Sequence, residues 1–271
     1  MRHVTYSLNF IEGGCSLSVT FAIITQKGGV GKTTTVNALA ASFKKMGKSV
    51  LCVDMDPQGN LSFSMGAETE NSLTVFDAIC GTSRVNSCIQ ETEITDILPS
   101  NILLTGAELE FTGKNREYIL KNVLSVVNDQ YDIILIDSPP GLGFLTVNAL
   151  SACDYVIIPM LPDIFSLQGL VQVYETIEFV KKGSNPTLEV MGIIINKYNK
   201  FNKLHREAAG TAAMVSENFG IPLFDTFVHS SDKLAEAHSL QLDIYDYCPK
   251  CAGTKDYYKI ANDIITELNS R

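Results

Sequence analysis

A glycine-rich segment between an apolar run and a helical pattern constrains the fold of this chain more than any other feature. Residues 19–25 read VTFAIIT and suit a buried strand, and residues 26–34 read QKGGVGKTT. A helix is expected over residues 33–46, and Gly47 is suited to end it. A strand, a glycine-rich turn and a helix in this order are typical of a phosphate-binding loop, because the helix N-terminus exposes backbone N–H groups. One position departs from the standard spacing: Gln26 stands where the pattern G-x-x-x-x-G-K-[ST] begins with glycine.

Apolar runs and helical patterns alternate along the rest of the chain. This alternation predicts an α/β fold with a single doubly wound, mostly parallel sheet flanked by helices. The expected strands are residues 19–25, 50–54, 133–137, 155–159 and 190–196, and the expected helices are residues 33–46, 116–127, 167–181, 204–219 and 260–268. Residues 57–115 are less periodic, and we expect a long excursion there that carries short helices.

The alternation places one domain over residues 19–271 and leaves residues 1–18 as an N-terminal extension. Two interpretations of the extension stay open: a disordered or packed segment, and a misassigned start at Leu17 or Val19. Codons for residues 12–14 can spell a purine-rich ribosome-binding site, which is the basis of the second interpretation. An intact N-terminal peptide from the native protein would exclude it.

The composition is that of an ordinary globular protein. Hydrophobic residues make up 45% of the 271 residues, and no apolar run approaches the roughly 18 residues that a membrane span needs. The first residues lack the features of a signal peptide, so we expect a cytoplasmic protein without a membrane partner. The net charge of −9 argues against wholesale binding to nucleic acid but is compatible with a local basic face. Seven cysteines, an odd number, argue against a disulfide framework.

The residue types of the glycine-rich segment suit a magnesium-bound nucleotide. Glycine lets the backbone turn its N–H groups towards phosphate oxygens, and Lys32 is expected to reach the β- and γ-phosphates. Thr33 is expected to ligate Mg²⁺, and Thr34 to hold the α-phosphate side. The expected nucleotide-binding residues of the loop are Gly28, Gly29, Val30, Gly31, Lys32, Thr33 and Thr34.

Carboxylates close two of the expected strands. Asp137 ends the run IILID, and Asp54 and Asp56 end the run VLCVDMD. Mg²⁺ is a hard cation that prefers oxygen ligands and keeps several waters. An aspartate at a strand end is often only a turn former, but two such strands beside a phosphate loop favour a metal site. The expected magnesium ligands, partly through water, are Thr33, Asp54 and Asp137.

Three ordered motifs, QKGGVGKTT, DMDPQGN and LIDSPPGLG, resemble those of the ParA/MinD ATPases, which carry a deviant Walker A motif. The resemblance runs from about residue 19 to the C-terminus and includes ALSACDYVIIP, SLQGL and KLAEA. The segments DPQGN and SPPGLG, and the lack of a basic C-terminal amphipathic helix, favour the ParA branch over the MinD branch. The resemblance implies a P-loop NTPase fold, ATP and Mg²⁺ as cofactors, and a slow ATPase that forms a homodimer on binding ATP.

The same resemblance assigns catalytic roles. Lys27 would cross the dimer interface to the nucleotide of the second subunit, where a cation stabilises the charge on the transferring phosphoryl group. Lys32 would contact the phosphates of its own subunit, Asp56 would position the attacking water, and Asp54 would support Mg²⁺ or the switch loop. Asn196, at the end of an expected strand, lies on the side expected for the adenine, and a helix or turn cap is its equal alternative.

ParA-type proteins bind DNA non-specifically as ATP dimers and respond to a ParB-like activator, which implies plasmid or chromosome partition and association with the nucleoid. The candidate DNA contacts are Lys197, Lys200, Lys203, Arg206 and Lys233, with a solvated basic loop as the alternative. The segment VHSSDKLAEA departs from many ParA chains, because His229, Ser230 and Lys233 replace a proline and two arginines. This departure leaves open a ParA-like scaffold that positions a protein cargo without binding DNA.

The sequence CPKC over residues 248–251 supplies two of the four ligands that a zinc or iron–sulfur site needs. Two such pairs across a two-fold dimer would complete one site. A metal-carrier ATPase that uses Cys248 and Cys251 is therefore a further alternative.

Overall fold

A computed structural model describes residues 17–271, so the two interpretations of the N-terminal extension concern residues that lie almost entirely outside the described part of the chain. A six-stranded sheet has the order β3-β2-β4-β1-β5-β6, and every pair of neighbouring strands is parallel. The strands are β1 (Val19–Ile23), β2 (Val50–Asp54), β3 (Asp96–Leu98), β4 (Ile133–Asp137), β5 (Tyr155–Met160) and β6 (Glu189–Ile195). The predicted doubly wound α/β fold is confirmed.

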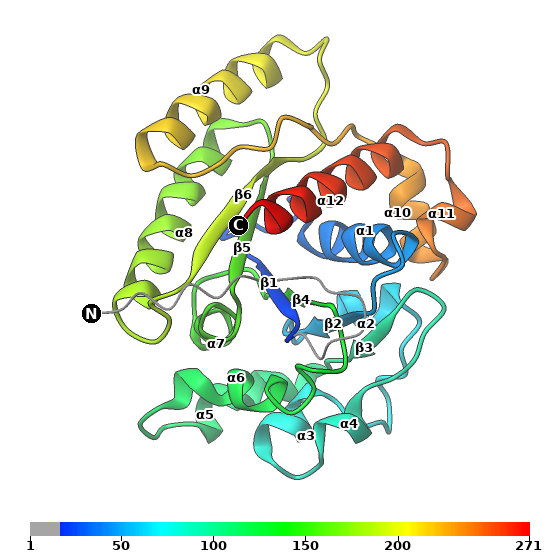
Figure 1. The fold of residues 1–271 in the computed structure, drawn as a ribbon, viewed down its shortest axis with the longest axis vertical. Helices are drawn as coiled ribbons and strands as arrows, with labels where there is room; N and C mark the ends of the chain where they lie inside the picture. Colours follow the sequence, from blue (N-terminus) through cyan, green and yellow to red (C-terminus); the bar gives the residue numbers. More distant parts are fainter. Residues whose placement is uncertain (1–16) are drawn as a thin grey trace.

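Helices cover both faces of the sheet (Figure 1). The longer helices are α1 (Lys32–Lys45), α7 (Phe144–Ala152), α8 (Ile164–Lys182), α9 (Lys203–Phe219), α10 (Asp232–Ser239) and α12 (Ala252–Ser270). The shorter helices are α2 (Asn60–Ser64), α3 (Val75–Cys80), α4 (Val85–Cys88), α5 (Ala107–Glu110), α6 (Ile119–Leu124) and α11 (Ile244–Tyr247), with 3₁₀ turns η1 (Ile102–Gly106) and η2 (Arg116–Tyr118).

Two hydrophobic cores lie on opposite faces of the sheet. On one face, α1 and α12 pack together over β1 and β4, with Phe43, Tyr257 and Ile260 fully enclosed. On the other face, α6, α7 and α8 bury side chains such as Leu120 and Leu150. Because both faces are covered, the strands are apolar throughout rather than alternating, and β4 is buried at every position.

Three details of the predicted elements were wrong. The excursion over residues 57–115 contains an edge strand, β3, which is too short to stand out as an apolar run. The helix expected over residues 116–127 is divided into η2 and α6. Helix α12 begins at Ala252 rather than at residue 260, because its first turns bury Gly253 and Thr254 instead of an aliphatic stripe.

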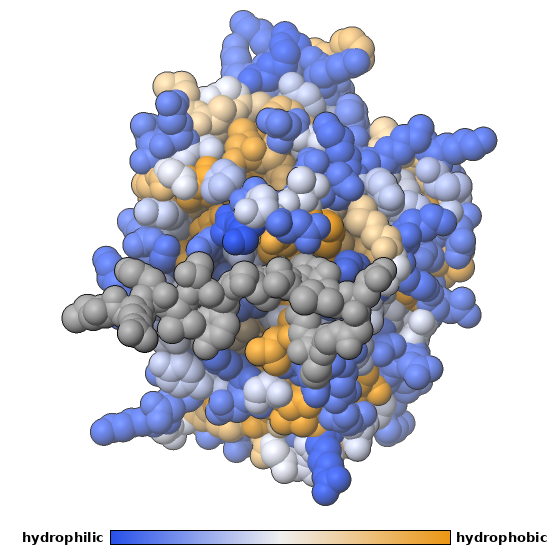
Figure 2. All heavy atoms as spheres, in the orientation of Figure 1, coloured by the Kyte–Doolittle hydropathy of each residue, from blue (hydrophilic) through white to orange (hydrophobic). Residues whose placement is uncertain are grey.

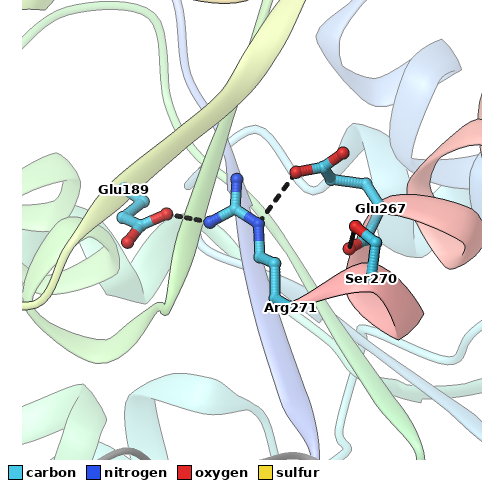
Figure 3. A network of polar contacts seen from close by, with 4 residues as sticks. All are labelled: Glu189, Glu267, Ser270 and Arg271. Carbon is cyan, nitrogen blue, oxygen red and sulfur yellow. Dashed lines mark hydrogen bonds and ion pairs between the residues drawn. The ribbon is translucent and has the colours of Figure 1, made fainter.

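The C-terminal end of α12 is tied to the sheet (Figure 3). The guanidinium group of Arg271 pairs with the carboxylate of Glu189 on β6 and donates from Nε to Glu267 at 3.0 Å. It also lies over the ring of Tyr155 on β5, 5.3 Å from the ring centroid. The last turn of the helix is therefore held against the two strands at one edge of the sheet.

Most of the surface in Figure 2 is hydrophilic, and the hydrophobic residues visible there form separate patches. Across residues 17–271, none of the helices combines the length and the apolarity that crossing a membrane would require.

Candidate nucleotide-binding site

The glycine-rich loop lies at the carboxyl end of β1, between β4 and β5 in the middle of the sheet. Strands β4 and β2 end beside it: Ile23 is in register with Asp137, and Asp137 is in register with Asp54. The sheet therefore brings together the loop and both strand-end carboxylates, as the sequence predicted.

The loop has the backbone of an anion-binding turn. Gly29 and Gly31 have φ of +75° and +94°, in the left-handed region that favours glycine. Among residues 17–271, no side chain caps the N-terminus of α1, and the first turn of the helix contains no acidic residue. The N–H groups at this end of the helix are thus available to phosphate oxygens, which the helix dipole also attracts.

Replacing Gly31 with alanine is expected to weaken nucleotide binding at least tenfold, as measured by titration with a fluorescent ATP analogue. The new Cβ would lie 3.1 Å from Nδ2 of Asn196 in a left-handed backbone, which costs about 1–2 kcal/mol. Gly47→Ala is the matched control, since Gly47 has φ of +81° and no atom of the described part of the chain lies within 4 Å of the added Cβ. Equal affinities in the two variants would contradict this role of Gly31.

Thr33 and Asp137, two of the predicted magnesium ligands, are in direct contact. Oγ1 of Thr33 donates to Oδ2 of Asp137 at 2.6 Å, and Oδ1 of Asp137 is buried without a partner among residues 17–271. Burial raises the pKa of the Asp137 carboxyl, and the negative charge of Asp54 raises it further. Burial also lowers the pKa of Lys32, against the opposing influence of Asp137 and Asp56. A hydroxyl, a free carboxylate oxygen and a buried lysine together fit Mg²⁺ and a polyphosphate.

Asp54 holds the loop that follows β2. Its carboxylate accepts from the backbone N–H groups of Asp56 at 3.0 Å and Ser62 at 2.9 Å, and from the Ser62 hydroxyl at 2.7 Å. The Ser62 hydroxyl in turn accepts from the N–H of Ser100 at 2.9 Å. Of the two roles expected for Asp54, these contacts favour support of the switch loop, and direct metal ligation by Asp54 stays a prediction.

Asp56 lies at the start of that loop and is 7% exposed. Its Oδ1 accepts from the N–H of Gln58 at 3.0 Å, which sets the orientation of the carboxylate. It is close enough to Lys32 to influence the lysine electrostatically. The predicted role in positioning the attacking water is compatible with this place and stays a prediction.

Lys27 is bound within its own chain. Its ammonium group contacts Oδ2 of Asp163 at 2.8 Å and lies 5.8 Å from the ring centroid of Phe165. Asp163 is the N-cap of α8, where Oδ1 accepts from the N–H of Ser166 at 2.8 Å. The side chains of Lys27 and Asp163 are 35% and 34% exposed, so a competing partner can reach both. Asp163 was not predicted from the sequence, because nothing near it along the chain links it to Lys27.

Asn196 occupies the far side of the loop and is almost fully buried. Its Nδ2 donates to the Val30 carbonyl at 3.0 Å and to Thr35 Oγ1 at 3.1 Å, and its Oδ1 accepts from the Tyr257 hydroxyl at 3.2 Å. These bonds tie α12 to the loop and to α1. The amide has a structural role, and the expected adenine contact stays a prediction. Tyr257 was also not predicted, because nothing near it in sequence marks it as part of the site.

A cavity of about 260 Å³ opens beside this network. It is lined by Val30, Gly31, Thr34, Asn196, Lys197, Val228, His229, Ser230, Ser231, Asp232, Leu234, Ala235 and Tyr257. The segment that departs from the ParA pattern therefore forms one wall of the cavity. Within that wall, the backbone N–H and Nδ1 of His229 contact the carboxylate of Asp256 on α12, at 2.9 and 2.8 Å.

The candidate DNA contacts fall into two places. Lys200, Lys203 and Arg206 are exposed around the start of α9, whereas Lys233 lies on α10, apart from them (Figure 1). Lys203 pairs with Glu207 at 3.6 Å, and Lys233 with Glu236 at 2.6 Å. The ammonium group of Lys197 donates to the carbonyl of Gly29 at 3.1 Å, so it contacts the phosphate loop. The DNA-contact role of these five residues stays a prediction.

Cys248 and Cys251 lie between α11 and α12. In the described part of the chain, no group of three or more His, Cys, Asp or Glu side chains is placed to hold a metal ion. A metal bound by these two cysteines would need ligands from a second chain, and that alternative stays a hypothesis.

The fold and this site define a P-loop nucleotide-binding protein, since a glycine-rich loop, a buried lysine and a strand-end aspartate meet at the centre of a parallel sheet. A family model described as an AAA domain matches residues 18–190.

The curated relatives specify the family. Chromosome-partitioning ATPase Soj of Treponema pallidum is 39% identical over 255 residues, which cover 93% of this chain and 99% of the relative. Chromosome partitioning protein ParA of Caulobacter vibrioides is 36% identical over 256 residues, with 92% and 95% covered. The chain belongs to the ParA/Soj family of chromosome-partitioning ATPases, which confirms the resemblance carried by its three motifs.

Solved structures share the fold of this chain. Cobyrinic acid a,c-diamide synthase from Mycobacterium smegmatis, with a bound ATP analog and magnesium, has a TM-score of 0.84 and 30% identity, covering 94% of this chain and 96% of that one. The septum site-determining protein MinD from Pyrococcus horikoshii, complexed with Mg-ADP, has a TM-score of 0.75 at 24% identity, covering 92% and 96%. The second comparison supports the fold alone.

Proposed function

We propose that this chain is a Mg²⁺-dependent ATPase that dimerises on binding ATP and acts as a nucleotide switch in plasmid or chromosome partition. The observation that carries the proposal is the meeting of Lys32, Thr33 and Asp137 beside the glycine-rich loop, with one carboxylate oxygen of Asp137 buried and unpartnered among the described residues. The partition ATPases among the relatives support the biological role.

The residues of this chain have distinct roles in the proposed reaction. Bound Mg²⁺ would offset the negative charge of the phosphates through Thr33 and Asp137. The N–H groups at the start of α1 and the ammonium group of Lys32 would bind the phosphate oxygens. Asp56 would accept a hydrogen bond from the attacking water, and its fixed orientation limits where that water can lie.

Lys27 would act across the dimer interface, on the phosphates of the partner subunit. In the single chain it pairs with Asp163, so the trans contact requires this pair to separate or rearrange. Both groups are about one-third exposed, where an ion pair is worth only about 0–1 kcal/mol. Lys27 can therefore leave Asp163 for the phosphates of a second subunit at a small cost in free energy. This change of partner would couple ATP binding to dimer formation.

We expect the ATP-bound dimer to bind DNA weakly and without sequence preference, through Lys200, Lys203 and Arg206. DNA binding should fall steeply as salt rises, because neutralising phosphates releases counterions. The triple variant replaces Lys200, Lys203 and Arg206 with alanine, and DNA binding is measured by fluorescence anisotropy in the presence of ATP. The slope of log affinity against log salt should become shallower by roughly 0.9 for each DNA phosphate that is no longer neutralised. A ParB-like activator and DNA should accelerate phosphate release from the wild-type protein.

The matched control carries Lys181→Ala and Lys182→Ala at the end of α8, which removes positive charge away from the α9 segment. If this control weakens binding as much per charge as the triple variant, the α9 segment has no special role. If the wild-type ATP dimer does not bind DNA even at low salt, the alternative scaffold for a protein cargo is favoured. The net charge of −9 and the pairing of Lys203 and Lys233 with glutamates are the observations on the side of that alternative.

A further inference from the structure

The segment Cys248–Pro249–Lys250–Cys251 has no part in the nucleotide site described above. It forms the turn between α11 and α12, in which the N–H of Cys251 donates to the Cys248 carbonyl at 3.1 Å. Cys251 is the N-cap of α12, a helix of 19 residues. The turn therefore brings two thiols together at the N-terminus of a long helix.

The two thiols differ in access. Cys248 is 6% exposed, and its Sγ lies 3.6 Å from Oγ1 of Thr254. Burial raises the pKa of the Cys248 thiol, against a hydrogen bond with Thr254 that lowers it. The backbone bond from Cys251 to Cys248 places the two cysteines in one turn. Cys251 is half-buried and lies at the N-cap of α12. An accessible thiol thus adjoins a protected one.

We propose that Cys248 and Cys251 form a redox-modification site, which a low-molecular-weight disulfide such as oxidised glutathione converts from a dithiol to an internal disulfide. The site is independent of the proposed ATPase function.

The reaction follows thiol–disulfide exchange. The Cys251 thiolate attacks one sulfur of the glutathione disulfide, a bond forms between the two sulfurs, and one glutathione thiolate leaves. The Cys248 thiolate then attacks the Cys251 sulfur, the internal disulfide forms, and the second glutathione thiolate leaves. Two electrons pass from the protein to glutathione, and the two protons lost by the cysteines are taken up by the two released thiolates.

The fold keeps the pair in place. Helix α12 is bound near its start by the Tyr257 hydroxyl, which contacts Thr35 and Asn196, and at its end by Arg271 (Figure 3). The Thr254 hydroxyl donates to the Cys248 carbonyl at 3.0 Å, which fixes the turn against the first turn of the helix. Within residues 17–271, three of the other cysteines, Cys52, Cys88 and Cys153, are buried and cannot compete for the oxidant.

The test is to incubate the folded, metal-free protein with oxidised glutathione and to map its thiols by alkylation and mass spectrometry. The expected product is one internal disulfide between Cys248 and Cys251, with no lasting glutathione adduct. In Cys248→Ser, the first step proceeds but the second does not, so a stable glutathione adduct on Cys251 is expected. In Cys251→Ser, oxidation of the pair is lost, and the variant is expected to fold because serine is a good N-cap.

Cys80→Ser is the matched control, since Cys80 is the other partly exposed cysteine of the described chain, and it should behave as the wild type. A persistent glutathione adduct on Cys251 of the wild-type protein would overturn the proposal. So would a disulfide that links either cysteine to a different residue, or full resistance of both thiols to oxidised glutathione.

Discussion

Replacing Lys27 with alanine is expected to abolish ATP-induced dimers and to lower the turnover of ATP by roughly 10³-fold, the usual effect of removing a cation supplied in trans. Binding of ATP to the monomer should change little, because the loop glycines and Lys32 remain. Sedimentation velocity with and without ATP measures the dimer, phosphate release measures turnover, and titration with a fluorescent analogue measures binding.

Two controls separate the trans role of Lys27 from general effects. Lys45→Ala removes an exposed lysine from the last turn of α1 and should leave dimers intact. Asp163→Asn removes the carboxylate that holds Lys27 but keeps an N-cap for α8, so dimers should persist. Unchanged dimerisation and turnover in Lys27→Ala would refute the assigned role. Loss of dimers in Asp163→Asn would instead make the pair with Asp163 part of the interface.

Replacing Asp56 with alanine is expected to have the opposite effect on the dimer. Turnover should fall by roughly 10²–10⁴-fold, the usual contribution of a group that orients or deprotonates a nucleophile. ATP binding should be retained, since the Asp137 and Thr33 pair is untouched, and unhydrolysed ATP should prolong the dimer. The measurements are phosphate release and the lifetime of the dimer after dilution.

A structural role for Asp56 has a different signature. The carboxylate also accepts from the N–H of Gln58, so its removal could loosen the loop that Asp54 holds. Asp56→Asn keeps an acceptor for that N–H but not the charge. If Asp56→Asn restores turnover, the orientation of the loop rather than the carboxylate is what the reaction needs.

Local patterns predicted most of the fold. The runs VTFAIIT, VLCVD and IILID became β1, β2 and β4, because a strand covered on both faces must be apolar at every position. The three-residue strand β3 was missed, since its pairing with β2 rather than its own sequence makes it a strand. The start of α12 was misplaced because Gly253, in its first turn, is buried without an apolar side chain to mark it. Gly253 packs so closely against Leu234 that a Cβ added to it would lie 2.6 Å from a Leu234 methyl group.

Sequence alone determined the phosphate loop, the strand-end aspartates and the family, since each depends on residue types at short, fixed spacing. Only the tertiary structure decided which distant side chains complete the site. Asp163 reaches Lys27 across 136 positions of sequence, and Tyr257 reaches Thr35 across 222. No local pattern predicts such contacts, because they depend on how β5, α8 and α12 are placed around β1. The physical reason is that hydrogen bonds and ion pairs act over a few ångströms, so packing, not spacing in the chain, selects the partners.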